Sequence, residues 1–355
     1  MAVSKKKAPA KSGGDKAKAY KDITARFKNE GLGRLYLLYG DESYLIDSFA
    51  ALIRKEVLDG GNDDFNLHRL EGNPSLAVLR EAVDAMPFMS ERSLVELWNA
   101  DVNAFNDDGF RALFADIPDW CTVVIRQATG IAPKGNLGIV KQIKKDGFAE
   151  EFAAQSESSL YSWIQKRFAA DGHRIGRSAM DTLCFLSGKL MTGLIPEIEK
   201  ISAAVAAEEI SVADVERYAH HIPEARSFEM TNAMADGDLN KAVSVMAELL
   251  QSGEEPIMIT ALLASQYRSL YAAKVFQSRK MERDRETFKE VTGKSGYGAN
   301  VTFETAKKFS LEELRQDVRL CARTDWLLKS DNTIGEEERM AELLIRLTMH
   351  GKALR

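Results

Sequence analysis

Cysteine is scarce in this chain: three occur among 355 residues, and none belongs to a C-x-x-C pair. Cys121, Cys184 and Cys321 lie far apart, and an odd number of separated cysteines is typical of buried free thiols in a reducing compartment. No histidine accompanies any of them in a recognisable motif, which leaves a catalytic thiol without support. The cysteine pattern therefore predicts free thiols and a cytoplasmic protein.

Residue patterns for metal binding and covalent hydrolysis are also missing. The five histidines show no i, i+4 spacing and no neighbouring cysteine, so we predict no metal site. No G-x-S-x-G segment and no Ser-His-Asp order appears, which removes support for a nucleophilic hydrolase. We therefore expect neither intrinsic catalysis nor a cofactor.

Long apolar runs are absent as well. The longest apolar stretch, Pro256–Phe276, is interrupted by Gln266, Arg268 and Lys274, whereas a membrane helix needs about 20 mainly apolar residues. The stretch is typical of a buried or amphipathic helix, and we expect no membrane association. The lysine-rich start of the chain has no apolar core, so a secretory signal is not expected.

Positive charge is concentrated at the start of the chain. Residues 1–21 carry seven lysines and one aspartate, while the whole chain has a net charge of −5, so the remainder is acidic. Tight binding of nucleic acid is driven by neutralisation of phosphates, which an acidic body opposes. We predict that residues 1–19 form a disordered basic tail.

One stretch has the outline of a phosphate-binding loop. The apolar run Leu35–Tyr39 predicts a buried parallel strand, Gly40 turns the chain, and a helix is expected from Ser43 to Leu58. The extra glycines, the lysine and the serine or threonine pattern of a working loop are absent. Asp41 and Glu42 stand where phosphates would lie. We expect them to satisfy the N–H groups at the start of this helix and to repel a polyphosphate.

A second nucleotide signature is missing further along the chain. The expected strand Ser93–Trp98 is followed by Asn99 and Ala100 rather than by a magnesium-binding acid, and Asp101 lies three residues beyond the strand. Gly293-Lys294-Ser295 matches the tail of a phosphate-loop motif by chance, because Phe288 occupies the position of its first glycine. The degenerate loop Gly40, Asp41, Glu42 and Ser43 is therefore predicted not to bind nucleotide.

Strands and helices alternate through the first part of the chain. The expected strands are Leu35–Tyr39, Phe65–Leu70, Ser93–Trp98, Cys121–Arg126 and Phe148–Phe152. Helices are expected between them, including Phe105–Phe114 and Gly135–Lys145, which favours a parallel sheet covered on both faces. From Ser156 onward we expect helices alone, among them Leu239–Gln251 with Asp238 as its N-cap and a core stripe of Leu239, Val243, Met246 and Leu250.

An apolar loop is expected at Met86, Pro87, Phe88 and Met89. Pro87 ends the preceding helix, so the phenylalanine and methionines belong to a loop and not to a periodic core face. Such residues are suited to anchoring in a pocket of another protein. The alternative is a loop folded back on the sheet.

Six segments of the chain form a recognisable series: Tyr36–Leu45, Ala85–Ser90, Leu194–Ile201, Ala233–Ala242, Leu250–Pro256 and Ala341–Ile345. In this order they resemble the delta subunit of the bacterial DNA polymerase III clamp loader. The resemblance extends from about Leu35 to the end of the chain. This chain has Pro87 where the family often has leucine beside its phenylalanine.

The resemblance implies an α/β P-loop NTPase-like (AAA+) domain with a parallel five-stranded sheet, a small helical lid domain and an all-α collar domain. The expected boundaries are a tail at 1–19 and domains at 20–153, 154–222 and 223–355. It also implies a subunit of the DNA polymerase III holoenzyme that neither binds nor hydrolyses ATP. Its implied role is to bind the sliding clamp (beta) through Met86, Pro87, Phe88 and Met89 and to favour the open ring.

The implied partners, besides the clamp, are the ATP-hydrolysing subunits and delta prime, joined through the collar, and primer-template DNA reached through the complex. Two other functions are left open by the residues themselves. One is an AAA+-like ATPase with an aberrant phosphate loop, and the other is a non-enzymatic DNA-binding module that uses the lysine tail.

Overall fold

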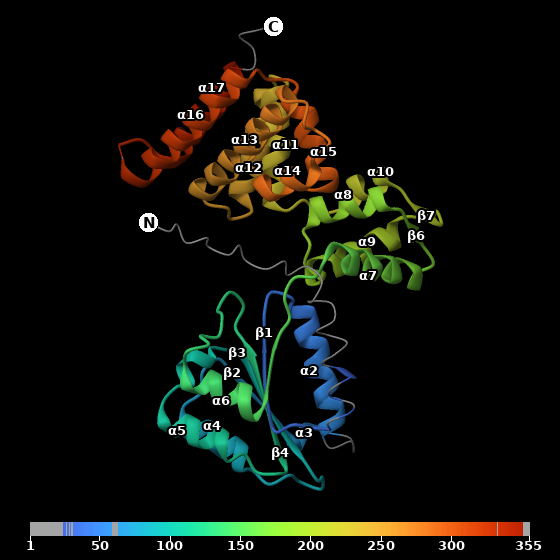
Figure 1. The fold of residues 1–355 in the computed structure, drawn as a ribbon, viewed down its shortest axis with the longest axis vertical. Helices are drawn as coiled ribbons and strands as arrows, with labels where there is room; N and C mark the ends of the chain where they lie inside the picture. Colours follow the sequence, from blue (N-terminus) through green and yellow to red (C-terminus); the bar gives the residue numbers. More distant parts are fainter. Residues whose placement is uncertain are drawn as a thin grey trace, which may run out of the picture. The chain divides into compact units, whose positions relative to one another are not determined.

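The computed structural model describes residues 24, 25, 27, 29, 31–58, 63–331 and 333–350. They form two compact units, which we call the first and second unit (Figure 1). The first runs to Trp163 and includes Lys189–Thr192, and the second comprises Ile164–Gly188 and the chain from Gly193 onward. The predicted tail at 1–19 lies outside the described residues. Among those residues, no helix has the length and apolar character needed to cross a membrane.

The first unit is built on a five-stranded parallel sheet in the order β2-β3-β4-β1-β5. Leu35 lies opposite Val123 and Tyr36 opposite Phe148, which places β1 between β4 and β5. The predicted α/β P-loop-like fold class is confirmed. The strands are β1 (Leu35–Tyr39), β2 (Leu67–Glu71), β3 (Ser93–Ala100), β4 (Cys121–Gln127) and β5 (Phe148–Glu151).

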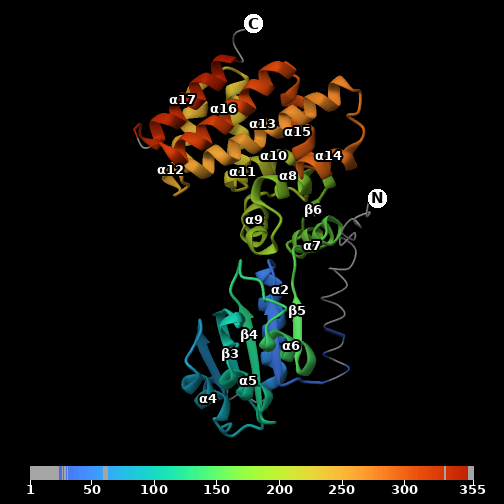
Figure 2. The same ribbon diagram turned by 60° about the vertical axis from the view of Figure 1, so that its left-hand side comes forward.

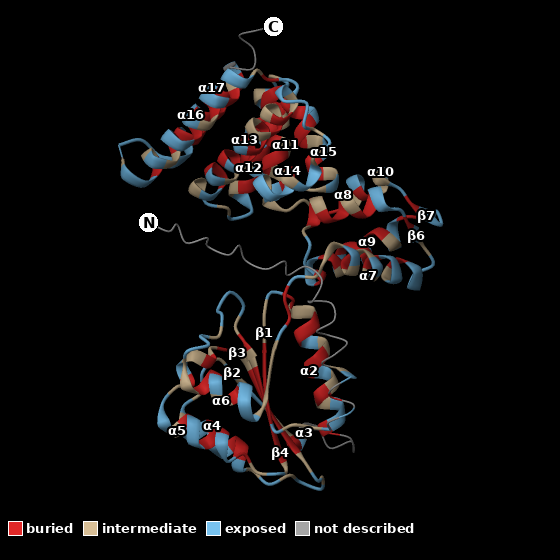
Figure 3. Ribbon diagram, viewed as in Figure 1, coloured by how far each residue is buried: buried red, intermediate tan, exposed pale blue. Residues whose placement is uncertain are grey.

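Helices cover both faces of this sheet (Figures 1 and 3). On one face the Tyr36 ring stacks on the Phe148 ring, with 5.0 Å between the ring centres, and lies edge-on to the Phe49 ring of α2, with 6.4 Å between the centres. On the other face Leu35 and Leu37 belong to a hydrophobic core formed with the helices that lie between Leu76 and Asp146 in the chain. Burial on both faces explains the unbroken apolar run of β1. The helices are α2 (Ser43–Val57), α4 (Leu76–Asp84), η1 (Val102–Phe105), α5 (Asp108–Ala115) and α6 (Gly138–Asp146).

Two expected elements of the first unit differ from those observed. The strand expected at Phe65–Leu70 begins only at Leu67, because Phe65 and Asn66 belong to a helical turn, α3 (Asp63–Asn66). The helix expected at Phe105–Phe114 is divided into η1 and α5. The division occurs because the Asp107 side chain accepts the Phe110 N–H at 2.9 Å and so starts a new helix.

The second unit is mainly helical, but the prediction of helices alone after Ser156 is wrong. A two-stranded parallel sheet joins β6 (Arg174–Ile175) to β7 (Glu209–Ile210). Strands of two residues are too short to show a period of their own. The helices of this part of the chain are α7 (Glu157–Ala170), which crosses the boundary between the units, α8 (Arg177–Ser187), α9 (Met191–Ala204) and α10 (Val212–Tyr218).

Seven further helices share one large core (Figures 2 and 3). Asp238 caps α12 as predicted, but the expected stripe is wrong at Val243, whose side chain is 39% exposed. The helix expected at Phe303–Phe309 instead spans Gly296–Ala306, and the Phe185 ring packs closely against its Gly298. The helices are α11 (Pro223–Ala235), α12 (Leu239–Gln251), α13 (Pro256–Ser278), α14 (Arg285–Thr292), α15 (Gly296–Ala306), α16 (Leu311–Ser330) and α17 (Glu336–His350).

The prediction of buried thiols is confirmed. Cys121, Cys184 and Cys321 are all buried, and their thiols are not joined in disulfide bonds. Burial raises the pKa of the Cys121 thiol to about 11, which keeps it protonated and unreactive near neutral pH.

Candidate functional site

The turn after β1 lies at the edge of the sheet where open α/β folds usually bind ligands. Because β1 stands between β4 and β5, the chain order reverses beside it, and such a switch point opens a crevice at the carboxyl ends of the strands. Gly40 has a φ of +127°, and a Cβ atom there would overlap the Phe152 carbonyl. The Glu42 N–H donates to that carbonyl at 2.9 Å. The chain's own backbone therefore lies against this turn.

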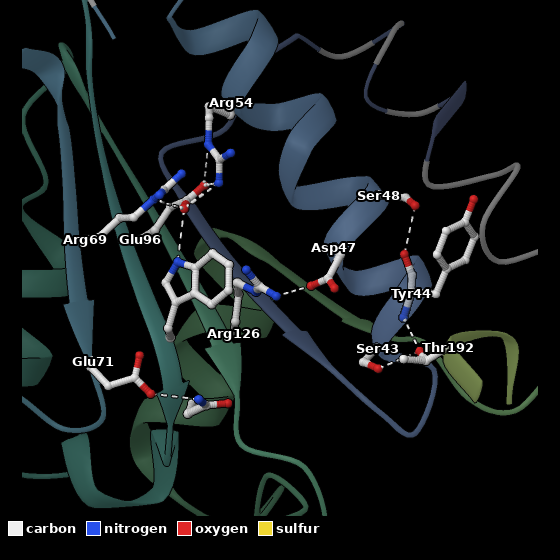
Figure 4. A network of polar contacts seen from close by, with 12 residues as sticks. Ser43, Tyr44, Asp47, Ser48, Arg54, Arg69, Glu71, Glu96, Arg126 and Thr192 are labelled. Atoms are coloured by element: carbon white, nitrogen blue, oxygen red, sulfur yellow. Dashed lines mark hydrogen bonds and ion pairs between the residues drawn. The ribbon is translucent and has the colours of Figure 1, made fainter. Parts of the chain in front are cut away.

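The Glu42 side chain does not cap the helix that follows it, so this part of the prediction is wrong. Its Oε1 atom accepts the Met191 N–H at 3.0 Å, at the start of α9, and it makes no side-chain bond to α2. In return the Thr192 hydroxyl accepts the Tyr44 N–H of α2 at 3.2 Å and lies 2.8 Å from the Ser43 hydroxyl (Figure 4). Side chains at the starts of α2 and α9 thus accept hydrogen bonds from each other's backbone N–H groups, at the place where a phosphate would be expected.

Glu42 is buried, and its second oxygen has no hydrogen-bond partner. Burial raises the pKa of its carboxyl from 4.5 to about 7, against the opposing effect of the Met191 and Thr192 N–H groups. The stabilisation that comes from the protonated form is therefore fully present below about pH 4.5 and is lost as the pH rises through about 7.

We expect Glu42→Gln to unfold with a higher free energy than the wild type at about pH 8, by on the order of 1–3 kcal/mol. Glutamine keeps the acceptor for Met191 and cannot ionise, so the two proteins should converge near pH 4.5. Urea unfolding across this pH range measures the difference. Asp41→Asn, which changes the exposed neighbour, is the matched control, and parallel curves for Glu42→Gln and wild type would contradict the assignment.

The strand expected at Ser93–Trp98 extends to Ala100, so Asp101 directly follows the end of β3 and does not lie three residues beyond it. Its side chain is nevertheless hydrogen-bonded to other residues of the protein. Asp101 Oδ1 accepts the Asn103 N–H at 3.0 Å, the Asn103 side-chain amide at 2.7 Å and the Gln127 amide at 3.2 Å. Its backbone N–H donates to Asn73 Oδ1 at 3.0 Å. No group of three or more acidic, histidine or cysteine side chains suited to a metal is found in the part of the chain that the structure describes. Asp101 is thus a structural residue here.

A buried carboxylate, Glu96, anchors the sheet to α2 (Figure 4). The Arg54 guanidinium donates to both of its oxygens at 2.7 Å, and the Trp98 indole N–H donates at 3.1 Å. The Arg126 guanidinium lies 3.5 Å from the centre of the Trp98 ring and pairs with Asp47 of α2. This network joins β3, β4 and α2 and gives Glu96 a structural role.

The second predicted site is exposed. The side chains of Met86, Phe88 and Met89 are 78%, 57% and 79% exposed, and Pro87 is partly buried. The loop therefore does not fold back on the sheet. We call Met86–Met89 the apolar tip.

Two residues that sequence patterns did not identify support the apolar tip. Asn66 is buried, and its side-chain amide accepts the Phe88 N–H at 2.7 Å and donates to the Phe88 carbonyl at 3.0 Å. The Phe65 ring is 66% exposed and lies 5.4 Å from the Phe88 ring. Their alternation with Leu67 suggested a strand, and no local signal marked their contact with a loop 22 residues away.

The structure does not bring the two predicted sites together. The Gly40–Ser43 loop follows β1, whereas the apolar tip precedes β3. In a parallel sheet the start of one strand and the end of another lie at opposite edges. A surface at the apolar tip can therefore act without the turn at Gly40–Ser43.

Comparison with known proteins identifies two matching family models, both of the DNA polymerase III delta subunit. The model described as DNA polymerase III, delta subunit, matches residues 36–153, and the model for the C-terminal domain of the DNA polymerase III delta subunit matches residues 224–347. The DNA polymerase III subunit delta of Bacillus subtilis is 25% identical over 329 residues, which cover 87% of this chain and 91% of that protein. The same subunit of Escherichia coli is 19% identical over 309 residues, which cover 85% of this chain and 88% of that protein. The solved structure of the Bacillus subtilis DNA clamp loader delta protein is 22% identical, covers 93% of this chain and 99% of that chain, and has a TM-score of 0.48.

Proposed function

The chain belongs to the DNA polymerase III delta subunit family, whose two models together cover more than half of it, and on that premise we propose that it is a clamp-loader subunit that binds the sliding clamp and favours the open ring. In this proposal the chain itself neither binds nor hydrolyses ATP. The observation that carries the proposal is the exposed apolar tip on a loop whose backbone is held in place.

The apolar tip has the chemistry of an anchor for an apolar pocket. Phe88 offers a rigid ring, and Met86 and Met89 offer flexible thioethers that adapt to irregular walls. A bound partner shifts an equilibrium only by its different affinity for the two states. Docking therefore favours the open clamp if the clamp pocket fits the apolar tip better in the open ring.

The absence of ATP chemistry is supported by the turn after β1. A polyphosphate needs bare backbone N–H groups at a helix N-terminus. Here the Glu42 N–H is taken by Phe152, the Tyr44 N–H is taken by Thr192, and the Glu42 carboxylate adds a repelling charge when ionised. Control by ATP would then come from partner subunits.

We assign the helical parts by their place in the chain. The proposed lid is 154–222 and the proposed collar is 223–355, whose start coincides with Pro223 at the first position of α11. The collar would join the chain to the ATP-hydrolysing subunits and delta prime of the DNA polymerase III holoenzyme. Primer-template DNA would be reached through that complex.

The test is binding of the purified full chain to the sliding clamp of its own organism, measured by calorimetry, with ATP and DNA binding measured in parallel. We expect clamp binding without nucleotide and no measurable binding of ATP. ATP binding by the chain alone would instead favour the ATPase with an aberrant loop. DNA binding that is steeply salt-dependent and lost on deletion of residues 1–19 would favour the DNA-binding module.

A further inference from the structure

We propose that the clamp-docking surface is built from two chain segments, in which Phe65 is a second aromatic contact and Asn66 positions Phe88. This inference rests on the proposed function and extends it to residues outside the apolar tip. The partner is the same apolar pocket on the sliding clamp. Both residues come from α3, and Asn66 lies 22 residues before Phe88.

Phe65 extends the apolar surface beside Phe88. Its ring is 66% exposed, and the centres of the two rings lie 5.4 Å apart with their planes tilted by 51°. Adjacent aromatic side chains at a surface form the kind of compact cluster that dominates binding energy at interfaces. A pocket that receives Phe88 meets Phe65 at its rim, since the two rings are in contact.

Asn66 holds the backbone of Phe88 and leaves its ring free. The side-chain amide accepts the N–H at 2.7 Å and donates to the carbonyl at 3.0 Å, so it pairs with Phe88 as a neighbouring strand would. Asn66 itself is only 1% exposed and cannot reach a partner protein. Its contribution to docking therefore passes through Phe88.

We call this pair of hydrogen bonds from Asn66 to the Phe88 backbone a bracket. The backbone conformation of the next residue, Met89, shows why it is needed. Met89 has a φ of +48°, a left-handed conformation that is uncommon for a side chain of this kind and persists only when its surroundings hold it. The Asn66 amide fixes the peptide units on both sides of Phe88, immediately before this position. A loop held in its binding conformation loses less conformational freedom on docking.

The chain contains a matched control for this bracket. Asn73 makes the same pair of hydrogen bonds to the backbone of Asp101, donating to its carbonyl at 2.9 Å and accepting its N–H at 3.0 Å. This second bracket lies beyond the carboxyl end of β2, at the other edge of the sheet from the apolar tip. Asn73→Ala therefore removes an equivalent pair of bonds at a site away from the apolar tip.

The experiment measures clamp affinity for Asn66→Ala, Phe65→Ala, Phe88→Ala, the double variant Asn66→Ala/Phe88→Ala and the control Asn73→Ala, all in the full chain. We expect about five- to tenfold weaker binding for Asn66→Ala and for Phe65→Ala. In Asn66→Ala a smaller fraction of the molecules holds the loop in its binding conformation, and in Phe65→Ala fewer contacts form with the clamp. Asn73→Ala should bind as the wild type does. Hydrogen exchange of the loop 85–92 should accelerate in the two variants that lack the Asn66 side chain and not in Asn73→Ala.

The double variant separates positioning from general damage. If Asn66 acts through Phe88, its loss should change affinity less than about twofold once Phe88 is alanine. An equal loss in both backgrounds, or wild-type affinity in Asn66→Ala, would overturn the positioning role. Wild-type affinity in Phe65→Ala would overturn the two-segment surface. Wild-type affinity in Phe88→Ala would remove the apolar tip as the docking surface, whereas no clamp binding by the wild-type chain would contradict the proposed function itself.

Discussion

Phe88→Ala should weaken binding of the chain to the sliding clamp by at least about 2 kcal/mol, which corresponds to about thirtyfold in the dissociation constant. The Phe88 ring is 57% exposed, so its removal leaves no cavity in the core, and the backbone bonds to Asn66 do not depend on the side chain. The fold and the loop should therefore survive. Calorimetric titration of the clamp with each variant measures the loss.

A suitable control is Val291→Ala, which shortens another exposed apolar side chain. Val291 is 63% exposed on α14, in the second unit. Its truncation should leave clamp affinity unchanged. If both variants bind as the wild type does, the apolar tip is not the docking surface, even if the chain binds the clamp elsewhere.

Arg54→Ala should lower the free energy of unfolding of the first unit by about 3–5 kcal/mol, because it leaves a buried carboxylate without its main partner. Glu96 is fully buried, and Arg54 supplies three hydrogen bonds to it. The Trp98 indole remains as a donor, and Arg69 lies 3.6 Å away, which places the expected loss toward the lower end of this range. Urea unfolding followed by circular dichroism measures it.

The cause of that loss can be tested with two further variants. Arg69→Ala should cost at most about 1 kcal/mol, because this arginine is more than half exposed and its ion pair is screened by solvent. Replacing Arg54 and Glu96 together by apolar residues should restore much of the stability, since no buried charge remains. A double variant as unstable as Arg54→Ala would show that packing, and not the unpaired carboxylate, sets the cost.

Local patterns predicted the features that depend on neighbours in the chain. The apolar run at Leu35–Tyr39 is buried on both faces and forms the strand it predicts. Pro87 lies just beyond α4, and the apolar residues after it are exposed as a loop. Asp238 caps its helix because a cap needs only the backbone three residues ahead.

Contacts between distant segments could not be predicted in this way. Glu42 was expected to serve its own helix, but its carboxylate binds Met191, 149 residues later, because the chain returns to that turn. Phe65 and Asn66 showed the alternation of a strand, yet they form a helical turn, and Asn66 brackets Phe88. A periodic pattern of residues along the chain does not reveal which distant residue such a side chain will bind.

The sequence by itself thus determined that a parallel sheet forms, that its phosphate loop lacks the residues for nucleotide, and that an apolar loop precedes β3. These are properties of hydrophobic period and residue type, which act over a few neighbours. Only the tertiary structure decided that Glu42 and Thr192 join two helix starts and that Asn66 holds Phe88. Hydrogen bonds of this kind depend on which distant segments of the chain lie side by side once the chain has folded.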